Sequence, residues 1–228
     1  MKPGVFVTGT DTGVGKTFAS CALIHALQAR GVRAVPMKPV VAGAAQHEGA
    51  WINEDTQALM QAAGCAPSMA ADVTPVLLRE PMAPHIAAAR EGRTIDLAPI
   101  WPAWARLAKA GAFSVVEGVG GFRVPLAPGL DTVDLAKTYA LPVVLVVGLR
   151  LGCLNHALLT AEAIERAGLA LAGWIANAID PRMAVPDENV AALRERLHAP
   201  LLGRLPHAPQ ASAAALAKWL DVGPLVGG

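Results

Sequence analysis

The feature that most constrains this chain is a glycine-rich stretch near its start, between a short apolar run and a helical pattern. Residues 9–17 read Gly-Thr-Asp-Thr-Gly-Val-Gly-Lys-Thr, and they follow the apolar residues 5–7. Glycines let successive backbone N–H groups turn toward a polyphosphate, and the N-terminus of the next helix adds the positive end of its dipole. Lys16 would then reach the β- and γ-phosphates, and the Thr17 hydroxyl would ligate Mg²⁺. The order strand, loop, helix is the one that a phosphate loop requires.

The loop departs from the usual spacing in one position. Its first glycine should stand five positions before Gly15, where this chain has Thr10, and Gly9 lies one residue earlier. The alternative is a glycine-rich turn with a chance Gly-Lys-Thr. Because both the context and the remaining spacing fit, the sequence favours a nucleotide site.

Short β-branched apolar runs alternate along the chain with alanine-rich stretches, which predicts an α/β fold with a mostly parallel sheet and helices on both faces. We expect strands at residues 5–8, 34–39, 113–117, 142–147, 171–176 and 201–205. We expect helices at residues 17–30, 54–63, 97–110, 155–167, 187–197 and 211–220. Residues 65–84 are rich in proline and give no clear pattern. With 228 residues and no repeat or linker, we expect one domain over residues 1–228.

Composition excludes several classes of protein. Hydrophobic residues make up 54% of the chain, which excludes extended disorder, and the formal net charge is only +1. The longest apolar run, residues 141–149, is nine residues long, against about 18 for a spanning helix. Three cysteines lie far apart at positions 21, 65 and 153, and the start has no signal-peptide pattern. We therefore expect a cytoplasmic protein with neither a nucleic-acid nor a membrane partner.

The unusual polar and glycine-rich residues fall where the predicted strands end. These positions are residues 9–17, 38, 117–121, 148–155, 177 and 206. Ligands of open α/β sheets bind at this carboxyl edge. Glu117 ends an apolar run, as the acidic residue that supports a bound metal does, and Asp55 is a second candidate. By itself Asp55 is more typical of a charge in the first turn of a helix. We predict a Mg²⁺ site formed by Thr17, Asp55 and Glu117.

Five segments of the chain together resemble the dethiobiotin synthetase family. They are residues 6–12, 14–17, 38–40, 116–118 and 151–157, and the resemblance runs from residue 5 to about residue 206. It implies a single-domain, P-loop NTPase-like fold that closes a ureido ring at the expense of ATP. The substrates would be 7,8-diaminononanoate, CO2 or bicarbonate, and ATP with Mg²⁺; the products would be dethiobiotin, ADP and phosphate. The path runs through a carbamate and a carbamic–phosphoric mixed anhydride, in a homodimer with its active sites at the interface.

The same resemblance implies roles for individual residues. It makes Thr12, Lys16 and Lys38 catalytic. The implied ATP contacts are Gly13, Val14, Gly15, Lys16, Thr17, Phe18, Asp55, Glu117, Gly118, Val119, Gly120, Asn177, Pro206, His207 and Ala208. The implied substrate contacts are Lys38 and, from the partner subunit, Gly152, Cys153, Leu154 and Asn155, whose backbone N–H groups suit a carboxylate.

Simpler interpretations exist for several of these residues. Taken without the resemblance, Lys38 is a surface lysine at a strand end, and Asn177 and residues 206–208 are ordinary loop residues. Asn155 serves as a helix cap in either case. We expect Cys153 to pack rather than react, and His156 to form a local or interface hydrogen bond.

The chain differs from the family pattern at four positions. Alanines at 42 and 83 replace serines, Gly13 replaces a residue that is often acidic, and Ala178 follows Asn177 where an acidic residue is common. The phosphate and metal residues remain, so we expect activity. The loss of two hydroxyl groups bears on substrate affinity, and the sequence leaves the nucleotide preference open.

Other P-loop proteins are the rival interpretations. ATPases that position cell components or carry iron–sulfur clusters have a further lysine near the start of the loop, whereas nothing basic lies between Lys2 and Lys16 here. Residues 211–220 carry only Lys218, unlike a basic membrane-binding helix, and no Cys-x-x-Cys is present. We expect no glutaminase domain of an amidotransferase-type synthetase in 228 residues. A nucleotide sensor without catalysis is a third possibility.

Overall fold

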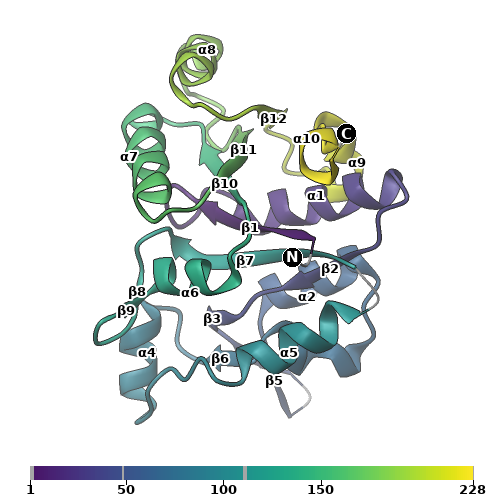
Figure 1. Ribbon diagram of the computed structural model, residues 1–228, viewed down its shortest axis with the longest axis vertical. Helices are drawn as coiled ribbons and strands as arrows, with labels where there is room; N and C mark the ends of the chain where they lie inside the picture. Colours follow the sequence, from purple (N-terminus) through teal and green to yellow (C-terminus); the bar gives the residue numbers. More distant parts are fainter. Residues whose placement is uncertain (1–2, 48, 110–111, 228) are drawn as a thin grey trace.

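The computed structural model describes residues 3–47, 49–109 and 112–227, and a six-stranded parallel sheet forms its centre (Figure 1). The order across the sheet is β12-β11-β10-β1-β7-β2. The bounds are β1 (Gly4–Gly9), β2 (Ala34–Met37), β7 (Phe113–Gly121), β10 (Val143–Gly148), β11 (Leu171–Asn177) and β12 (Leu201–Leu205). All six predicted strands are therefore confirmed. β7 runs four residues beyond its predicted end, and β2 stops two residues early, before Pro39.

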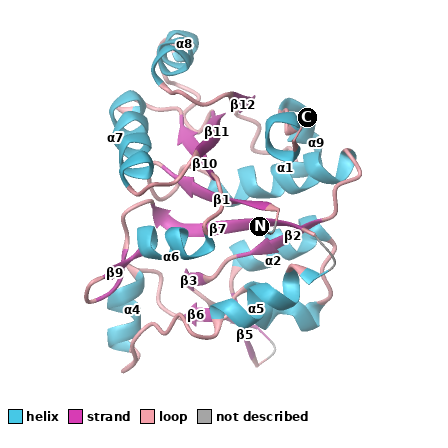
Figure 2. Ribbon diagram, viewed as in Figure 1, coloured by secondary structure: helices cyan, strands magenta, loops and turns pink. Residues whose placement is uncertain are grey.

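Neighbouring strands bring the functional segments to one edge. β1 lies between β10 and β7, with Val7 in register with Glu117 and Gly9 with Gly121. The strands are buried along nearly their whole length, which is why they read as continuous apolar runs rather than as alternating patterns. All neighbouring strands of the sheet pair in parallel, so their carboxyl ends lie at one edge, where the phosphate loop follows β1 (Figure 2).

Helices cover both faces of the sheet (Figure 1). On one face α1 (Lys16–Ala29) and α2 (Glu54–Ala63) pack with the C-terminal segment against Val5, Val7 and Val115. On the other face lie α5 (Ile100–Leu107), α6 (Thr132–Tyr139), α7 (Cys153–Arg166) and α8 (Pro186–Arg196). The predicted fold class, with helices on both faces, is confirmed.

Two predicted helices differ from the structure. The helix expected at residues 97–110 begins only at Ile100, after the Asp96 side chain has accepted the N–H of Ala98, and its expected last residue lies outside the described residues. The helix expected at 211–220 divides into α9 (Ala213–Leu216) and a 3-10 helix (Ala217–Trp219). Leu220 is extended and forms an antiparallel bridge with Gly203, so pairing with the edge strand ends the helix.

Short elements that the sequence did not predict lie mostly beyond the β2 edge of the sheet. They are β3 (Val40–Ala42), β4 (Ala45–His47), β5 (Ala50–Ile52), a 3-10 helix (Pro67–Met69), α3 (Ala70–Val73), β6 (Val76–Leu78), α4 (Pro84–Arg90), β8 (Pro125–Ala127), β9 (Leu130–Asp131) and α10 (Gly223–Val226). β3 pairs with β6 in parallel, and β3 contributes Val41 and Ala42 to one wall of the site described below.

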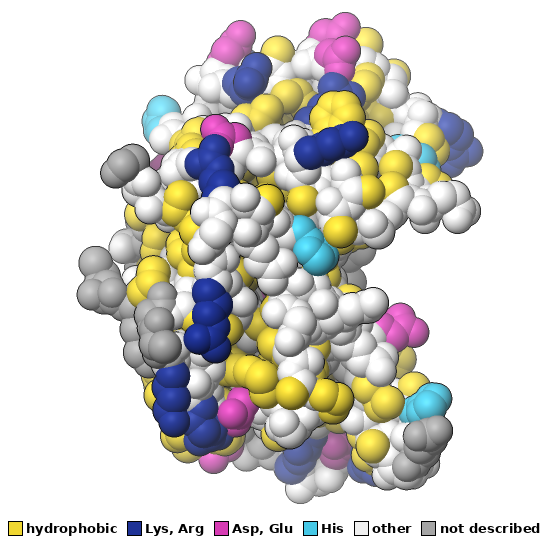
Figure 3. Space-filling view, turned by 90° about the vertical axis from the view of Figure 1, so that its right-hand side faces the viewer, with side chains coloured by type: hydrophobic (Ala, Val, Ile, Leu, Met, Phe, Trp, Pro, Cys, Tyr) yellow, Lys and Arg dark blue, Asp and Glu magenta, His cyan; other side chains and the backbone are white. Residues whose placement is uncertain are grey.

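The surface shown in Figure 3 carries basic side chains scattered among acidic and uncharged ones, without a continuous basic patch on that face. Among the described residues, no helix combines the length and the apolar character that crossing a lipid bilayer requires.

Candidate nucleotide and substrate site

The phosphate loop is held in place by an asparagine from β11. Gly15 caps α1 with φ +80°, a left-handed conformation that glycine adopts without strain. A Cβ atom on Gly15 would lie 2.2 Å from Asn177 Nδ2, so the close approach also requires glycine. Asn177 Nδ2 donates a hydrogen bond of 2.9 Å to the Val14 carbonyl. The predicted ATP contact Asn177 therefore has a positioning role in the loop itself.

Asp11 organises the first half of the loop. Its carboxylate accepts the N–H of Thr12 at 2.7 Å and a hydrogen bond from Arg150 at 2.6 Å. Its carbonyl oxygen accepts a hydrogen bond of 2.9 Å from Lys16 Nζ, which folds the lysine back along the loop. Sequence reasoning missed both Asp11 and Arg150. The only signal was that each follows a neighbouring strand of the sheet, β1 and β10.

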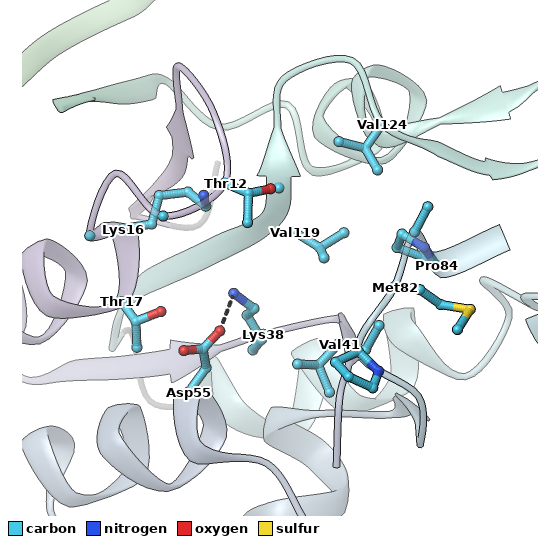
Figure 4. Close-up of a pocket in the computed structure, with 16 residues that line it drawn as sticks. Thr12, Lys16, Thr17, Lys38, Val41, Asp55, Met82, Pro84, Val119 and Val124 are labelled. Carbon is cyan, nitrogen blue, oxygen red and sulfur yellow. Dashed lines mark ion pairs between the residues drawn. The ribbon is translucent and has the colours of Figure 1, made fainter. Parts of the chain in front are cut away.

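Lys38 lies between the carboxylates of Glu117 and Asp55, and Figure 4 shows its ion pair with Asp55. It follows β2, and its Nζ contacts Glu117 Oε1 and, at 3.0 Å, Asp55 Oδ2. Glu117 is fully buried, and its Oε1 also accepts a hydrogen bond of 2.8 Å from the Thr17 hydroxyl. Residues from four separate segments thus meet at one point, and Lys38 is not the exposed surface lysine of the simpler interpretation.

The charges of this cluster shift one another's proton affinity. Burial lowers the pKa of Lys38, but the Glu117 and Asp55 carboxylates outweigh burial and raise it overall. Burial raises the pKa of Asp55, but the Lys38 ammonium outweighs it, so the net shift is downward. Burial lowers the pKa of Lys16 to about 8, although Glu117 acts against the shift. Lys38 and Asp55 are therefore charged at neutral pH.

The donor atoms fit a hard cation. Glu117 Oε2 is buried and has no hydrogen-bond partner among the described residues, and Asp55 and Thr17 provide further oxygen atoms nearby. Mg²⁺ bound with a nucleotide takes one or two carboxylates and completes its shell with phosphate oxygens and water. No group of three or more His, Cys, Asp or Glu side chains suited to a metal occurs in the described part of the chain. The oxygen atoms of Thr17, Asp55 and Glu117 could therefore hold a Mg²⁺ ion that binds together with a nucleotide.

A cavity of about 700 Å³ opens beside this cluster and has two unlike ends. The polar end carries Thr12, Gly13, Gly15, Lys16, Thr17, Lys38 and Asp55, and Gly120 with Val119 lies between the ends. The other end is formed by Val41, Ala42, Pro81, Met82, Ala83, Pro84 and Val124. The labelled side chains of Figure 4 show the two groups on opposite sides of the space. The cavity suits a ligand with a charged end and an alkyl portion.

The apolar end was largely missed by sequence reasoning. Val41 and Val124 look like ordinary core residues, and residues 81–84 belong to the proline-rich region without a clear pattern. Ala42 and Ala83, which replace serines of the resembling family, both line this end and make it less polar. Among the residues of this apolar end, only these two differences from the family pattern were noted in the sequence.

Some predicted ATP contacts do not line this cavity. Pro206 and His207 line a second one, of about 490 Å³, together with Leu149, Arg204 and Trp219. His207 Nδ1 lies 3.1 Å from the carbonyl oxygen of Ala178. Val14 is buried in the core, while Phe18 and Ala208 are half-buried against it. Gly118 lies where a Cβ atom would approach the Phe6 ring to 3.1 Å.

The predicted substrate-binding segment of α7 stands apart from the cavity of its own chain. Gly152, with φ +92°, caps α7, and Gly152 and Asn155 are exposed. Leu154 is half-buried, and Cys153 is buried, with its Sγ 3.9 Å from Asn189 Oδ1, as expected of a packing residue. None of residues 152–155 lines the 700 Å³ cavity.

Comparison with known proteins agrees with this geometry. A family model described as an AAA domain matches residues 3–215. Similar solved structures include MinD in the MinC:MinD cell division complex of Aquifex aeolicus, at TM-score 0.55 and 14% identity, over 96% of this chain and 87% of that one. A ParA family ATPase from Chlorobium tepidum gives TM-score 0.53 and 14% identity over 97% and 92%. Chloroplast FtsY from Physcomitrella patens gives 0.53 and 15% over 100% of this chain and 66% of that chain.

At such identities the neighbours show the fold, and the family match covers most of the chain. The phosphate loop, its strand-to-helix context and the parallel sheet agree with both. The chain belongs to this AAA domain family and has the fold of a P-loop NTPase.

Proposed function

We propose that this protein is a dethiobiotin synthase, which uses ATP to carboxylate and cyclise 7,8-diaminononanoate. The observation that carries the proposal is Lys38. A second buried lysine stands beside the phosphate-loop lysine, at the junction of a phosphate-binding end and an apolar end of one cavity. When water accepts the γ-phosphate of ATP, no cation is needed beside it, because water is uncharged. An anionic acceptor does need one, because it must approach the γ-phosphate against charge repulsion.

The proposed reaction begins when one amine of the substrate attacks CO2 and loses a proton, giving a carbamate. A carbamate oxygen then attacks the γ-phosphorus of ATP, ADP leaves, and a carbamic–phosphoric anhydride forms. The neighbouring amine attacks the carbonyl carbon, the C–O bond breaks, and phosphate departs with the former carbamate oxygen. The second amine loses a proton, and the ureido ring is closed.

Different residues of the cavity would serve different parts of this reaction. Lys16 neutralises the β- and γ-phosphates, and backbone N–H groups of residues 12–17 orient them. Lys38 neutralises the carbamate and its phosphorylated form, while the Thr12 hydroxyl lies at the same end of the cavity. Thr17, Asp55 and Glu117 would hold Mg²⁺, which supplies charge neutralisation at the β- and γ-phosphates when it is bound. The apolar end accommodates the alkyl chain.

The remaining contacts are proposed on the family resemblance. The base would lie near Asn177 and residues 206–208, of which Pro206 and His207 line the second cavity. Gly152, Cys153, Leu154 and Asn155 would bind the substrate carboxylate of the partner subunit in a homodimer, since they do not line the cavity of their own chain. The three cysteines are unpaired, which suits a cytoplasmic protein.

The test is incubation with MgATP, bicarbonate and 7,8-diaminononanoate, followed by mass analysis for dethiobiotin. We expect product only when all three substrates are present. The Lys38→Gln variant should lose about 10²–10³ in turnover without a loss of ATP affinity, because one preorganised cation is removed. Lys137→Gln, at the exposed end of α6, is the matched control. ATP consumption without any new product would contradict the proposal.

A further inference from the structure

We propose that the Lys38 ammonium and Mg²⁺ are exchangeable occupants of one site, so that binding of the metal–nucleotide releases Lys38 into the cavity. The inference rests on the metal site of the proposed function, but not on the identity of the organic substrate. The starting observation is that Lys38 contacts the same carboxylates that fit the metal. The oxygens that contact Lys38 Nζ belong to Glu117 and Asp55, two of the three residues that fit the metal.

Both cations would share the Glu117 and Asp55 carboxylates. Glu117 Oε1 accepts hydrogen bonds from Lys38 Nζ and from the Thr17 hydroxyl, which leaves Oε2, the buried oxygen without a partner among the described residues, for the metal. A Mg²⁺ ion bound at about 2.0–2.1 Å occupies the space in front of its ligand oxygens. An ammonium group left in contact with the same carboxylates would also stand a few ångströms from a doubly charged ion in a buried setting, where repulsion is weakly screened. This repulsion favours the departure of Lys38 when the metal arrives.

When Lys38 leaves the carboxylates, its side chain moves into the cavity. The Lys38 backbone is fixed, because its N–H donates to the Val73 carbonyl at 2.8 Å and the preceding strand is paired with β7. The movement is confined to the side chain, which lines the 700 Å³ cavity (Figure 4). A buried ammonium that has lost its carboxylates needs another anion. In the cavity that anion is the γ-phosphate or a carboxylate-like group on the acceptor.

Exchange of this kind couples the two ligands. Lys38 competes with the metal, so the apparent metal affinity equals the intrinsic affinity multiplied by the fraction of molecules in which Lys38 does not hold the carboxylates. In return, the bound metal frees Lys38 for the anionic acceptor, and linkage makes the acceptor strengthen metal binding by the same factor. The Lys38 ammonium therefore becomes available to the acceptor only after the metal–nucleotide has bound. This order keeps Lys38 paired until phosphoryl transfer is possible.

The experiment measures Mn²⁺ binding in the presence of ADP, by electron paramagnetic resonance, in the wild-type protein and in Lys38→Met. ADP is used because it has no γ-phosphate for Lys38 to contact. We expect Lys38→Met to bind Mn²⁺ at least about tenfold more tightly, since the competing cation is gone. Equal or weaker Mn²⁺ binding in a folded Lys38→Met variant would overturn the proposal. Lys137→Met is the control for an ordinary loss of one positive charge.

A second measurement uses the native protein, because removal of Lys38 leaves two close carboxylates and can impair folding. The side-chain ammonium of Lys38, labelled with ¹⁵N and identified by its absence in Lys38→Arg, is followed by nuclear magnetic resonance. We expect Mg²⁺ with ADP to shift this signal or broaden it, and ADP with a chelator to leave it in place. A signal unmoved by Mg²⁺ with ADP would refute the exchange. Neither measurement requires the formation of dethiobiotin. The exchange proposal can therefore fail while the proposed function holds, and the proposed function can fail while the exchange is observed.

Discussion

Two glycines of the phosphate loop share a left-handed backbone but have different surroundings. Gly13 has φ +74° and no atom within 4 Å of the place where a Cβ atom would stand, whereas the same atom on Gly15 would meet Asn177. Both would be strained by an alanine, but only Gly15→Ala displaces the amide from the Val14 carbonyl. We expect it to cost about 1–3 kcal/mol more than Gly13→Ala in free energy of unfolding, through a buried polar group left unpaired. Denaturant titration of both variants checks this, and equal costs would remove the role assigned to Asn177.

Lys16 gives the site a measurable pH dependence. Burial lowers its pKa to about 8, so the ammonium is partly deprotonated at pH 8. Phosphate groups favour the charged form, which raises the pKa in the complex. Nucleotide binding should therefore take up protons near pH 8, and affinity should fall as pH rises above that value. Calorimetry in two buffers of different ionisation enthalpy measures the uptake. Lys16→Ala should abolish it, and an uptake that survives in this variant would contradict the assignment.

Among the elements of the fold, those with a strong apolar pattern were predictable. β1, β7 and β10 are buried on both faces, so their sequences are continuous apolar runs that identify them as strands. The three-residue strands β3 and β6 gave no such pattern, because they are stabilised by each other and by the core rather than by their own sequence. The residues proposed to bind metal and phosphate were predicted from motifs and spacing, whereas the apolar wall depends on contacts between distant segments. The Asp11–Arg150 pair also needed the order of strands.

The packing of the C-terminal segment against the edge strand β12 can be tested by substitution. A Cβ atom on Gly203 of β12 would lie 2.0 Å from the backbone oxygen of Trp219, so the C-terminal segment would have to move. On the neighbouring strand, a Cβ atom on Gly173 would meet only the Leu202 side chain, which can rotate. We expect Gly203→Ala to destabilise the protein by roughly 1–3 kcal/mol, and Gly173→Ala by less. Thermal and denaturant unfolding compare the two, and the opposite ranking would contradict the close packing of β12.

For the whole molecule, the surface around the start of α7 bears on assembly. Leu151, two residues before α7, is 98% exposed, and Leu159, in the middle of α7, is 57% exposed; both are large apolar side chains that the fold of this chain leaves uncovered. Their exposure supports the proposed homodimer, in which this helix approaches the partner's cavity. We expect the wild-type protein to sediment as a dimer and Leu159→Glu as a folded monomer. Ile86→Glu, on exposed α4, is the control and should remain dimeric. A monomeric wild-type protein at micromolar concentration would exclude the dimer.

The proposed function requires above all that the γ-phosphate passes to a carbamate oxygen and not to water. The fate of isotopic oxygen tests this most directly. The protein is incubated briefly with ¹⁸O-labelled bicarbonate, 7,8-diaminononanoate and MgATP in ordinary water, and the released phosphate is examined by mass spectrometry. Transfer to the carbamate predicts one labelled oxygen in each phosphate released, because the C–O bond of the anhydride breaks on ring closure. Unlabelled phosphate at the same turnover would show that water is the acceptor, and would contradict the proposed function.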